Sequence, residues 1–247
     1  MFKLTAHSKR LVLGTAQLGM KYGIANRTGQ PDLKTAEQII QTVWKNGICE
    51  FDTAQAYENS EEVLGHCLSE LRITQDALVI SKFHPCLDYL NWKQLSIALD
   101  KSLSRLHISR LAGIMLHKEE HLKLWEKGLK EIMFTFVKDG RVDRLGVSVY
   151  SPKKALEALQ TDGIEMVQIP TNILDSRFRD AGVFDLAEQK GKEVYVRSIF
   201  LQGLLLMKPR PRSPLSLIIE NVPYYSVEDE EIVVLRVGHR RDIYRRL

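Results

Sequence analysis

Residues 78–117, LVISKFHPCLDYLNWKQLSIALDKSLSRLHISRLAGIMLH, contain the pattern that decides the fold. The stretch begins with a run of β-forming residues at 78–82 and ends with an apolar run at 111–117. Between these runs, apolar residues recur at helical spacing, at Leu95, Leu99, Leu103 and Leu106. Two strands joined by a helix lie parallel in a sheet, so the stretch predicts a strand–helix–strand unit.

The same unit repeats along the chain. Further strand-like runs, with starts roughly thirty residues apart, occupy 11–13, 48–52, 144–149, 166–169 and 194–199. Helix signals agree with them, since Thr35 and Gln38 have the spacing of a capping box and Asn59 precedes an acidic first turn. Glycines at 47, 163 and 191 end helical stretches. Seven parallel strands with helices between them favour a (β/α)8 TIM barrel over an open doubly wound sheet.

The pattern stops after the seventh strand. Residues 208–214 contain three prolines, which suit neither a helix interior nor a central strand. No eighth unit is recognisable beyond them, so the barrel is expected to be truncated or altered there. We therefore predict a barrel domain at 1–207 and an atypical segment at 208–247 that is not an independent domain.

Composition places the chain among ordinary soluble proteins. Of 247 residues, 44% are hydrophobic and 27% charged, which argues against disorder and against a small disulfide-rich fold. The net charge of +4 is concentrated in residues 236–247, so nucleic acid is an unlikely partner for the neutral body. Three cysteines without Cys-x-x-Cys spacing predict reduced thiols, and no apolar run is long enough for a membrane span. We expect a cytoplasmic protein without a membrane partner; the sequence leaves its oligomeric state open.

Four polar residues stand at or just after the predicted strand ends, where parallel barrels carry their active sites. They are Asp52, Tyr57, Lys82 and His117. A tyrosine donates its proton only when a cation stabilises the phenolate, and Lys82 supplies such a charge. Asp52 would keep Lys82 charged, and His117 would orient a carbonyl oxygen toward Tyr57. A proton donor without a protein nucleophile suits reduction of a carbonyl by a nicotinamide.

The residues around these four resemble the aldo/keto reductase family. The resemblance rests on Leu13-Gly14-Thr15, on Phe51-Asp52-Thr53-Ala54 with Tyr57, on Ile80-Ser81-Lys82, on Met115-Leu116-His117, on Gly146-Val147-Ser148, on Val167-Gln168, on Arg197-Ser198 and on Leu201-Gln202-Gly203. It spans about residues 10–207. It implies a TIM barrel, an NADP(H) cofactor, a small-molecule carbonyl substrate and Tyr57 as the general acid.

The resemblance also implies a set of cofactor-binding positions. They are Gly14, Thr15, Asp52, Ser148, Gln168, Arg197, Ser198, Leu201 and Gly203. The chain departs from the family at Val149, since it has Ser148-Val149 where many members have Ser-Asn, and at Arg197, where many members stack a tyrosine on the nicotinamide. At its end, residues 225–247 resemble the last strand and basic terminus of RelE/ParE-type toxins. We interpret them as a remnant without ribonuclease activity, and expect weak cofactor affinity in consequence.

Two short motifs resemble sites of other kinds. His117-Lys118-Glu119-Glu120-His121 matches an inverted zinc-protease pattern, but His117 ends a strand and no third ligand is marked, so no metal is expected. Residues 14–21 approach a phosphate-binding loop but lack its Ser or Thr. Two functional alternatives stay open: a catalytically impaired barrel that is a binding module or the product of a gene rearrangement, and a basic tail that contacts RNA.

Overall fold

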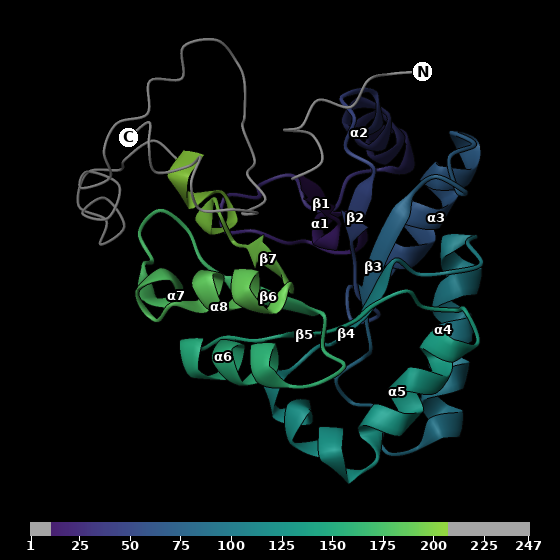
Figure 1. The fold of residues 1–247 in the computed structure, drawn as a ribbon. Coiled ribbons are helices and arrows are strands. Elements are labelled where there is room, and N and C mark those ends of the chain that lie inside the picture. The colour runs from purple at the N-terminus through teal and green to yellow at the C-terminus, as the bar shows by residue number, and fades with distance from the viewer. Residues whose placement is uncertain (1–10, 207–247) are drawn as a thin grey trace.

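The computed structural model describes residues 11–206, which form one parallel sheet surrounded by helices (Figure 1). The strands are β1 (Val12–Gly14), β2 (Glu50–Asp52), β3 (Leu78–Lys82), β4 (Gly113–Leu116), β5 (Leu145–Ser148), β6 (Met166–Pro170) and β7 (Glu193–Arg197). The helices are α1 (Ala16–Gly19), α2 (Leu33–Lys45), α3 (Ser60–Glu70), α4 (Trp92–Leu106), α5 (Leu129–Lys138), α6 (Pro152–Gln160), α7 (Arg177–Asp180) and α8 (Val183–Lys190), with 3-10 segments η2 (Glu119–Lys127) and η3 (Leu201–Leu206).

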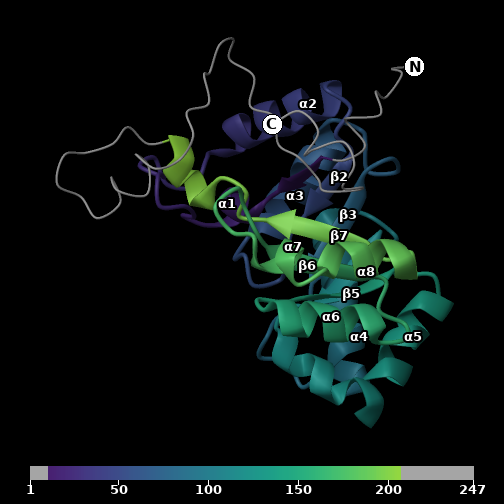
Figure 2. The same cartoon turned by 60° about the vertical axis from the view of Figure 1, so that its left-hand side comes forward.

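The sheet curls into a nearly closed barrel. Its strands pair in sequence order, each parallel to the next. Strands β2 and β7 are separated by four others in this order, yet the Tyr195 hydroxyl lies 2.6 Å from Glu50 Oε1. Only strong curvature brings these side chains together across the interior, while the helices lie around the outside (Figures 1 and 2). The predicted fold class is confirmed.

Alternation along the strands separates two cores. Ile80, Met115, Met166 and Tyr195 meet in a small cluster inside the barrel. Their sequence neighbours, such as Val79 and Ile114, belong to the large cluster between strands and helices. Because successive strand residues point to opposite faces, the strand positions two residues beyond the inner cluster also face inward. This places the polar residues at the carboxyl ends of the strands over the inner cluster.

Two local predictions are corrected by the structure. Helix α2 begins earlier than a Thr35 cap allows, because Asp32 is its N-cap and accepts a hydrogen bond from the Thr35 backbone N–H at 2.8 Å. Strand β7 ends at Arg197 rather than at Ile199, because Ser198 has a φ of 64°, which no strand residue adopts. Asn59 does stand at the N-cap of α3, though its side chain makes no capping hydrogen bond.

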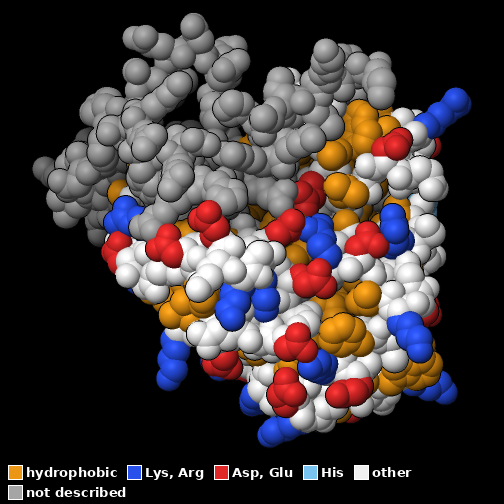
Figure 3. All heavy atoms as spheres, in the orientation of Figure 1, with side chains coloured by type: hydrophobic (Ala, Val, Ile, Leu, Met, Phe, Trp, Pro, Cys, Tyr) orange, Lys and Arg blue, Asp and Glu red, His pale blue; other side chains and the backbone are white. Residues whose placement is uncertain are grey.

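The exposed surface mixes both signs of charge. On the face drawn in Figure 3, acidic and basic side chains are interspersed over the described elements. No helix within residues 11–206 is long and apolar enough to cross a membrane. The expected boundary at 207, the altered end of the barrel and the toxin-like residues 225–247 lie outside the described residues, as does the basic tail.

Candidate active site

Two neighbouring strands bring a carboxylate and an ammonium together. Asp52 ends β2 and Lys82 ends β3, and the inward face of each strand carries the side chain into the barrel. The Lys82 ammonium donates to Asp52 Oδ1 and, at 3.0 Å, to the Thr53 carbonyl oxygen. Its side chain is 1% exposed and that of Asp52 15% exposed. The pair is therefore held in a largely desolvated position at the mouth of the barrel.

The loop after β2 folds Tyr57 back over this pair. A turn closed by the Tyr57 N–H and the Ala54 carbonyl, 3.0 Å apart, sets its direction. Lys82 Nζ lies 5.3 Å from the centre of the Tyr57 ring. The His117 ring, just beyond β4, meets it edge-on with ring centres 5.9 Å apart. The structure thus brings together all four predicted residues.

Burial and charge oppose each other at the phenol and the ammonium. Burial raises the pKa of Tyr57, although the Lys82 ammonium lowers it. Burial also works against the charge of Lys82, but the Asp52 carboxylate and Tyr57 outweigh it, so the pKa of Lys82 is raised. At neutral pH the phenol therefore keeps its proton and the amine keeps its charge. This is a proton donor next to a fixed cation.

His117 is a neutral imidazole at physiological pH. Its burial, reinforced by the positive charge of Lys82, lowers the pKa of His117 to about 4. Its Nδ1 is buried and has no hydrogen-bond partner in the described part of the chain. A neutral imidazole donates from one nitrogen and accepts at the other, so His117 can hydrogen-bond a substrate oxygen without giving up a proton.

The lowered pKa of His117 predicts a pH dependence of stability. Above pH 6.5, the ordinary value, the group is neutral in both folded and unfolded chains and contributes no pH dependence. Between pH 6.5 and about 4 the unfolded chain takes up a proton that folded His117 refuses, so the free energy of unfolding falls as the pH falls.

Urea unfolding at pH 7 and pH 5 measures this effect. We expect the wild-type chain to lose more stability between the two values than His117→Gln, which has no group to titrate. An equal loss in both chains would show that His117 titrates normally in the folded state.

Strands β5 and β6 add an amide and a hydroxyl beside the four residues. Gln168, in β6, donates from Nε2 to Asp52 Oδ2 at 3.1 Å. Its Oε1 is buried and has no partner among residues 11–206, which leaves an acceptor facing the site. Ser148, at the end of β5, is buried and pairs in register with Gln168. Such a donor and acceptor set fits a carboxamide group.

The segment after β7 has an unusual backbone. Positive φ angles occur at Ser198, Leu201, Gln202 and Gly203, so the chain turns sharply within a few residues. The Gln202 carbonyl accepts from the Ala25 N–H at 3.3 Å, which ties this segment to the loop between α1 and α2. Ser198, Leu201 and Gly203 therefore lie on one strained segment that directly follows β7.

The turn after β1 is anchored to the catalytic strands. Gly14 ends β1 in register with Asp52. The buried Thr15 hydroxyl donates to the Asp52 carbonyl oxygen at 3.0 Å and lies 2.9 Å from Ser60 Oγ. Thr15 therefore already has partners within the protein, whereas Gln168 and Arg197 keep unpaired polar atoms.

Two residues that support the site were not predicted from the sequence. A Cβ at Gly19 would lie 2.0 Å from the Tyr57 carbonyl oxygen, so only glycine lets α1 support the Tyr57 loop. Tyr150, in the loop after β5, stacks under Arg197, with the guanidinium carbon 4.4 Å from the ring centre. The sequence signal for Gly19 is a glycine inside a short helix. No local pattern indicates that Tyr150 contacts Arg197.

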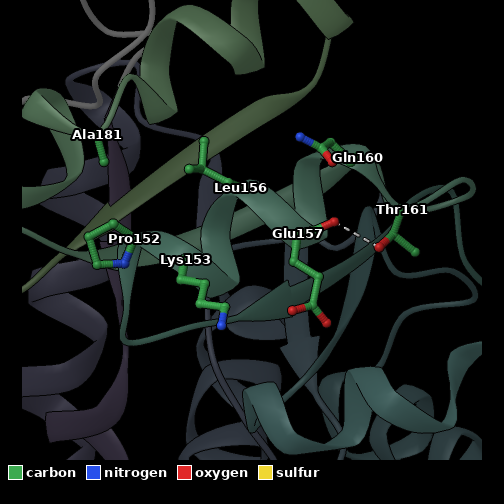
Figure 4. A pocket seen from close by; sticks show the side chains of 7 residues that line it. All are labelled: Pro152, Lys153, Leu156, Glu157, Gln160, Thr161 and Ala181. Atoms are coloured by element: carbon green, nitrogen blue, oxygen red, sulfur yellow. Dashed lines mark hydrogen bonds between the residues drawn. The ribbon is translucent and has the colours of Figure 1, made fainter.

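Two other features lie away from this site. His121 stacks on Tyr89 with ring centres 3.9 Å apart, and no group of three or more possible metal ligands is found within the described ranges. An open depression on the outside of the barrel is lined by α6 and by Ala181, and its polar side chains face solvent (Figure 4). Neither shares a residue with the strand-end site.

Comparisons with known proteins agree with this geometry. A model of the Aldo/keto reductase family matches residues 10–216. The D-arabinose 1-dehydrogenase of Saccharomyces cerevisiae is 29% identical over 153 residues, which are 57% of this chain and 42% of the yeast protein. The chain thus spans less than half of the length of that relative.

Solved structures show the same fold. The holo form of an aldo-keto reductase from Bacillus halodurans aligns with a TM-score of 0.70 at 24% identity, covering 87% of this chain and 73% of its own. The glycerol dehydrogenase of Gluconobacter oxydans aligns with a TM-score of 0.66 at 23% identity, covering 83% of this chain and 64% of its own.

Proposed function

Because the chain belongs to the aldo/keto reductase family, we propose that it is an NADP(H)-dependent oxidoreductase acting on a small aldehyde, ketone or alcohol. The observation that carries the proposal is the convergence of Asp52, Tyr57, Lys82 and His117, from three strand ends and one loop, at the mouth of the barrel. No protein nucleophile stands in this set, and a general acid beside a cation is what carbonyl reduction requires of a protein.

The four residues divide the work on the carbonyl oxygen. His117 hydrogen-bonds the oxygen and orients it toward Tyr57. Tyr57 gives its proton to the oxygen, and Lys82 stabilises the phenolate that remains. Asp52 keeps Lys82 charged and fixed throughout. The nicotinamide, when bound, supplies the hydride that the carbonyl carbon accepts. In alcohol oxidation the same groups work in reverse, with Tyr57 taking up the proton.

The residues present fit a nicotinamide cofactor. Ser148 and the free Oε1 of Gln168 would hold the carboxamide, since they offer a hydroxyl and an unpaired acceptor. Gly14, Thr15 and Asp52 would border it on the side of β1 and β2, and Arg197 on the side of β7. Ser198, Leu201 and Gly203 would lie along the phosphates, because a turn with several positive φ angles presents backbone N–H groups to anions.

Cofactor binding and turnover are tested together. Titration of the full chain with NADPH and with NADH, followed by nucleotide fluorescence, should show saturable but weak binding with little preference for NADPH over NADH. The complex should then reduce 4-nitrobenzaldehyde with oxidation of NADPH at 340 nm. Binding without turnover would favour the alternative of a binding module, and absence of both would overturn the proposal.

A further inference from the structure

Arg197 is a charged residue at the mouth of the barrel, and it takes no part in the proton transfer assigned to the four catalytic residues. It ends β7, two residues after Tyr195 of the inner cluster, so it lies on the inward face of the strand. Its positive charge also acts on the pKa values of Tyr57, Lys82 and His117, in agreement with this inward position. The carbonyl that these residues receive therefore lies close to Arg197.

The Arg197 guanidinium is packed against an aromatic ring but has no ion-pair partner among the described residues. Its plane is supported by the ring of Tyr150, 4.4 Å from the guanidinium carbon. Stacking uses the face of the guanidinium and leaves its N–H edge available for a planar acceptor. Its Nη2 is buried and has no hydrogen-bond partner within residues 11–206, and none of the ion pairs among those residues includes Arg197. A buried donor of this kind is costly unless a ligand satisfies it.

The charges around it leave a positive site. The negative charge of Asp52 is already compensated, because its carboxylate accepts hydrogen bonds from Lys82 and Gln168. His117, with a pKa of about 4, adds no charge at neutral pH. Arg197 is then a cation beside the reacting carbonyl that no ion pair within residues 11–206 compensates, and an anionic group on the ligand would neutralise it.

We propose that Arg197, supported by Tyr150, binds a carboxylate of the substrate, so that the chain prefers aldehydes or ketones bearing an acidic group. This inference rests on the proposed function, because it assigns a substrate class to that site. Arg and a carboxylate form two parallel hydrogen bonds, which also fixes the orientation of the carbonyl relative to Tyr57. A phosphate oxygen of the cofactor shares this chemistry and is distinguished by the experiment.

The test compares two nearly equal aldehydes, 4-carboxybenzaldehyde and its neutral methyl ester, methyl 4-formylbenzoate. With wild-type chain and saturating NADPH, we expect kcat/KM to favour the carboxylate about 10- to 100-fold, mainly through KM. In Arg197→Met this ratio should fall to about one, whatever happens to the two absolute rates. Arg197→Lys should keep part of the preference, because it retains the charge but not the planar guanidinium.

A matched control removes the same charge elsewhere. Arg177 also stacks on an aromatic ring, 5.8 Å from the centre of Phe178, but it is bound to Asp175 outside the site. Arg177→Met should keep the wild-type ratio. A fall in that variant equal to the fall in Arg197→Met would show that long-range charge, not contact, sets the preference, and would overturn the proposal.

A binding measurement independent of turnover completes the test. Calorimetric titration of the cofactor-free chain should show binding of benzoate but not of benzamide, and Arg197→Met should lose it. Equal rates for the two aldehydes would overturn the proposal. Weaker NADPH binding by Arg197→Met with an unchanged aldehyde ratio would also overturn it, and would assign the guanidinium to the cofactor alone. Benzoate binding without reduction of either aldehyde would instead contradict the proposed oxidoreductase function and keep the anion site.

Discussion

Tyr57→Phe is expected to reduce carbonyl reduction by about 10²- to 10⁴-fold, the range that a general acid contributes. The variant removes one hydroxyl and keeps the ring that lies edge-on to His117 and 5.3 Å from Lys82 Nζ. Binding of NADPH and the midpoint of urea unfolding should therefore stay near the wild-type values. Steady-state rates with 4-nitrobenzaldehyde, measured with fluorescence titration and unfolding on the same preparation, check the result.

A second tyrosine serves as the control for this substitution. Tyr22, in the loop between α1 and α2, is exposed and makes no hydrogen bond with Tyr57 in the described part of the chain. Tyr22→Phe removes the same atom near the mouth and should leave turnover within about twofold of wild type, since it takes no part in proton transfer. Wild-type turnover in Tyr57→Phe would contradict the role assigned to Tyr57 even if the family assignment holds.

Lys82→Met is expected to impair both turnover and stability. Without the ammonium the phenol loses the stronger of the two cations that lower its pKa, Lys82 and Arg197, so turnover should fall about 10²- to 10⁴-fold. The Asp52 carboxylate, 15% exposed, would also lose its ion pair, and breaking a buried pair on one side costs about 3–5 kcal/mol. Because Asp52 keeps its bond to Gln168, the lower end of this range is expected. Urea unfolding and steady-state kinetics measure the two losses separately.

The double variant Asp52→Asn with Lys82→Met separates the two effects. It removes both charges, so most of the lost stability should return while turnover stays low. If the double variant is as unstable as Lys82→Met alone, the loss comes from altered packing around the methionine, and the ion pair is not its cause.

Much of the fold could be predicted from local sequence patterns, because the predicted runs coincide with the observed strands. The run at 78–82 is strand β3 to the residue, because an apolar stretch between two helices has only the buried sheet to enter. The predicted run at 111–117 shortens to β4, since Leu111 makes only an isolated bridge to Val142. The end of a strand depends on the length of the strand that pairs with it, and this length cannot be predicted from the sequence of one strand alone.

The residues of the candidate site at the strand ends could also be predicted from local patterns, but contacts between distant segments could not. Parallel strands point their carboxyl ends one way, so Asp52, Lys82 and His117 had to meet once the strands were identified. The pairing of Arg197 with Tyr150 could not be predicted, because it joins the end of β7 to the loop after β5, and strand β6 with helices α6, α7 and α8 lies between them in the chain. The cofactor roles of Ser148, Gln168 and the turn at 198–203 stay predictions, based on a family resemblance and on unpaired atoms.

The curvature of the sheet also has a consequence for the order of folding. Each strand pairs with its neighbour in sequence, so the sheet can grow step by step through contacts of modest sequence separation. The bonds that cross the interior are different, since Gln168 reaches Asp52 over 116 residues and Tyr195 reaches Glu50 over 145. Closing such long loops is expected to come late. A kinetic intermediate with most of its helices and strands formed would then still lack the Asp52–Gln168 contact, and recovery of cofactor binding during refolding would lag behind recovery of secondary structure.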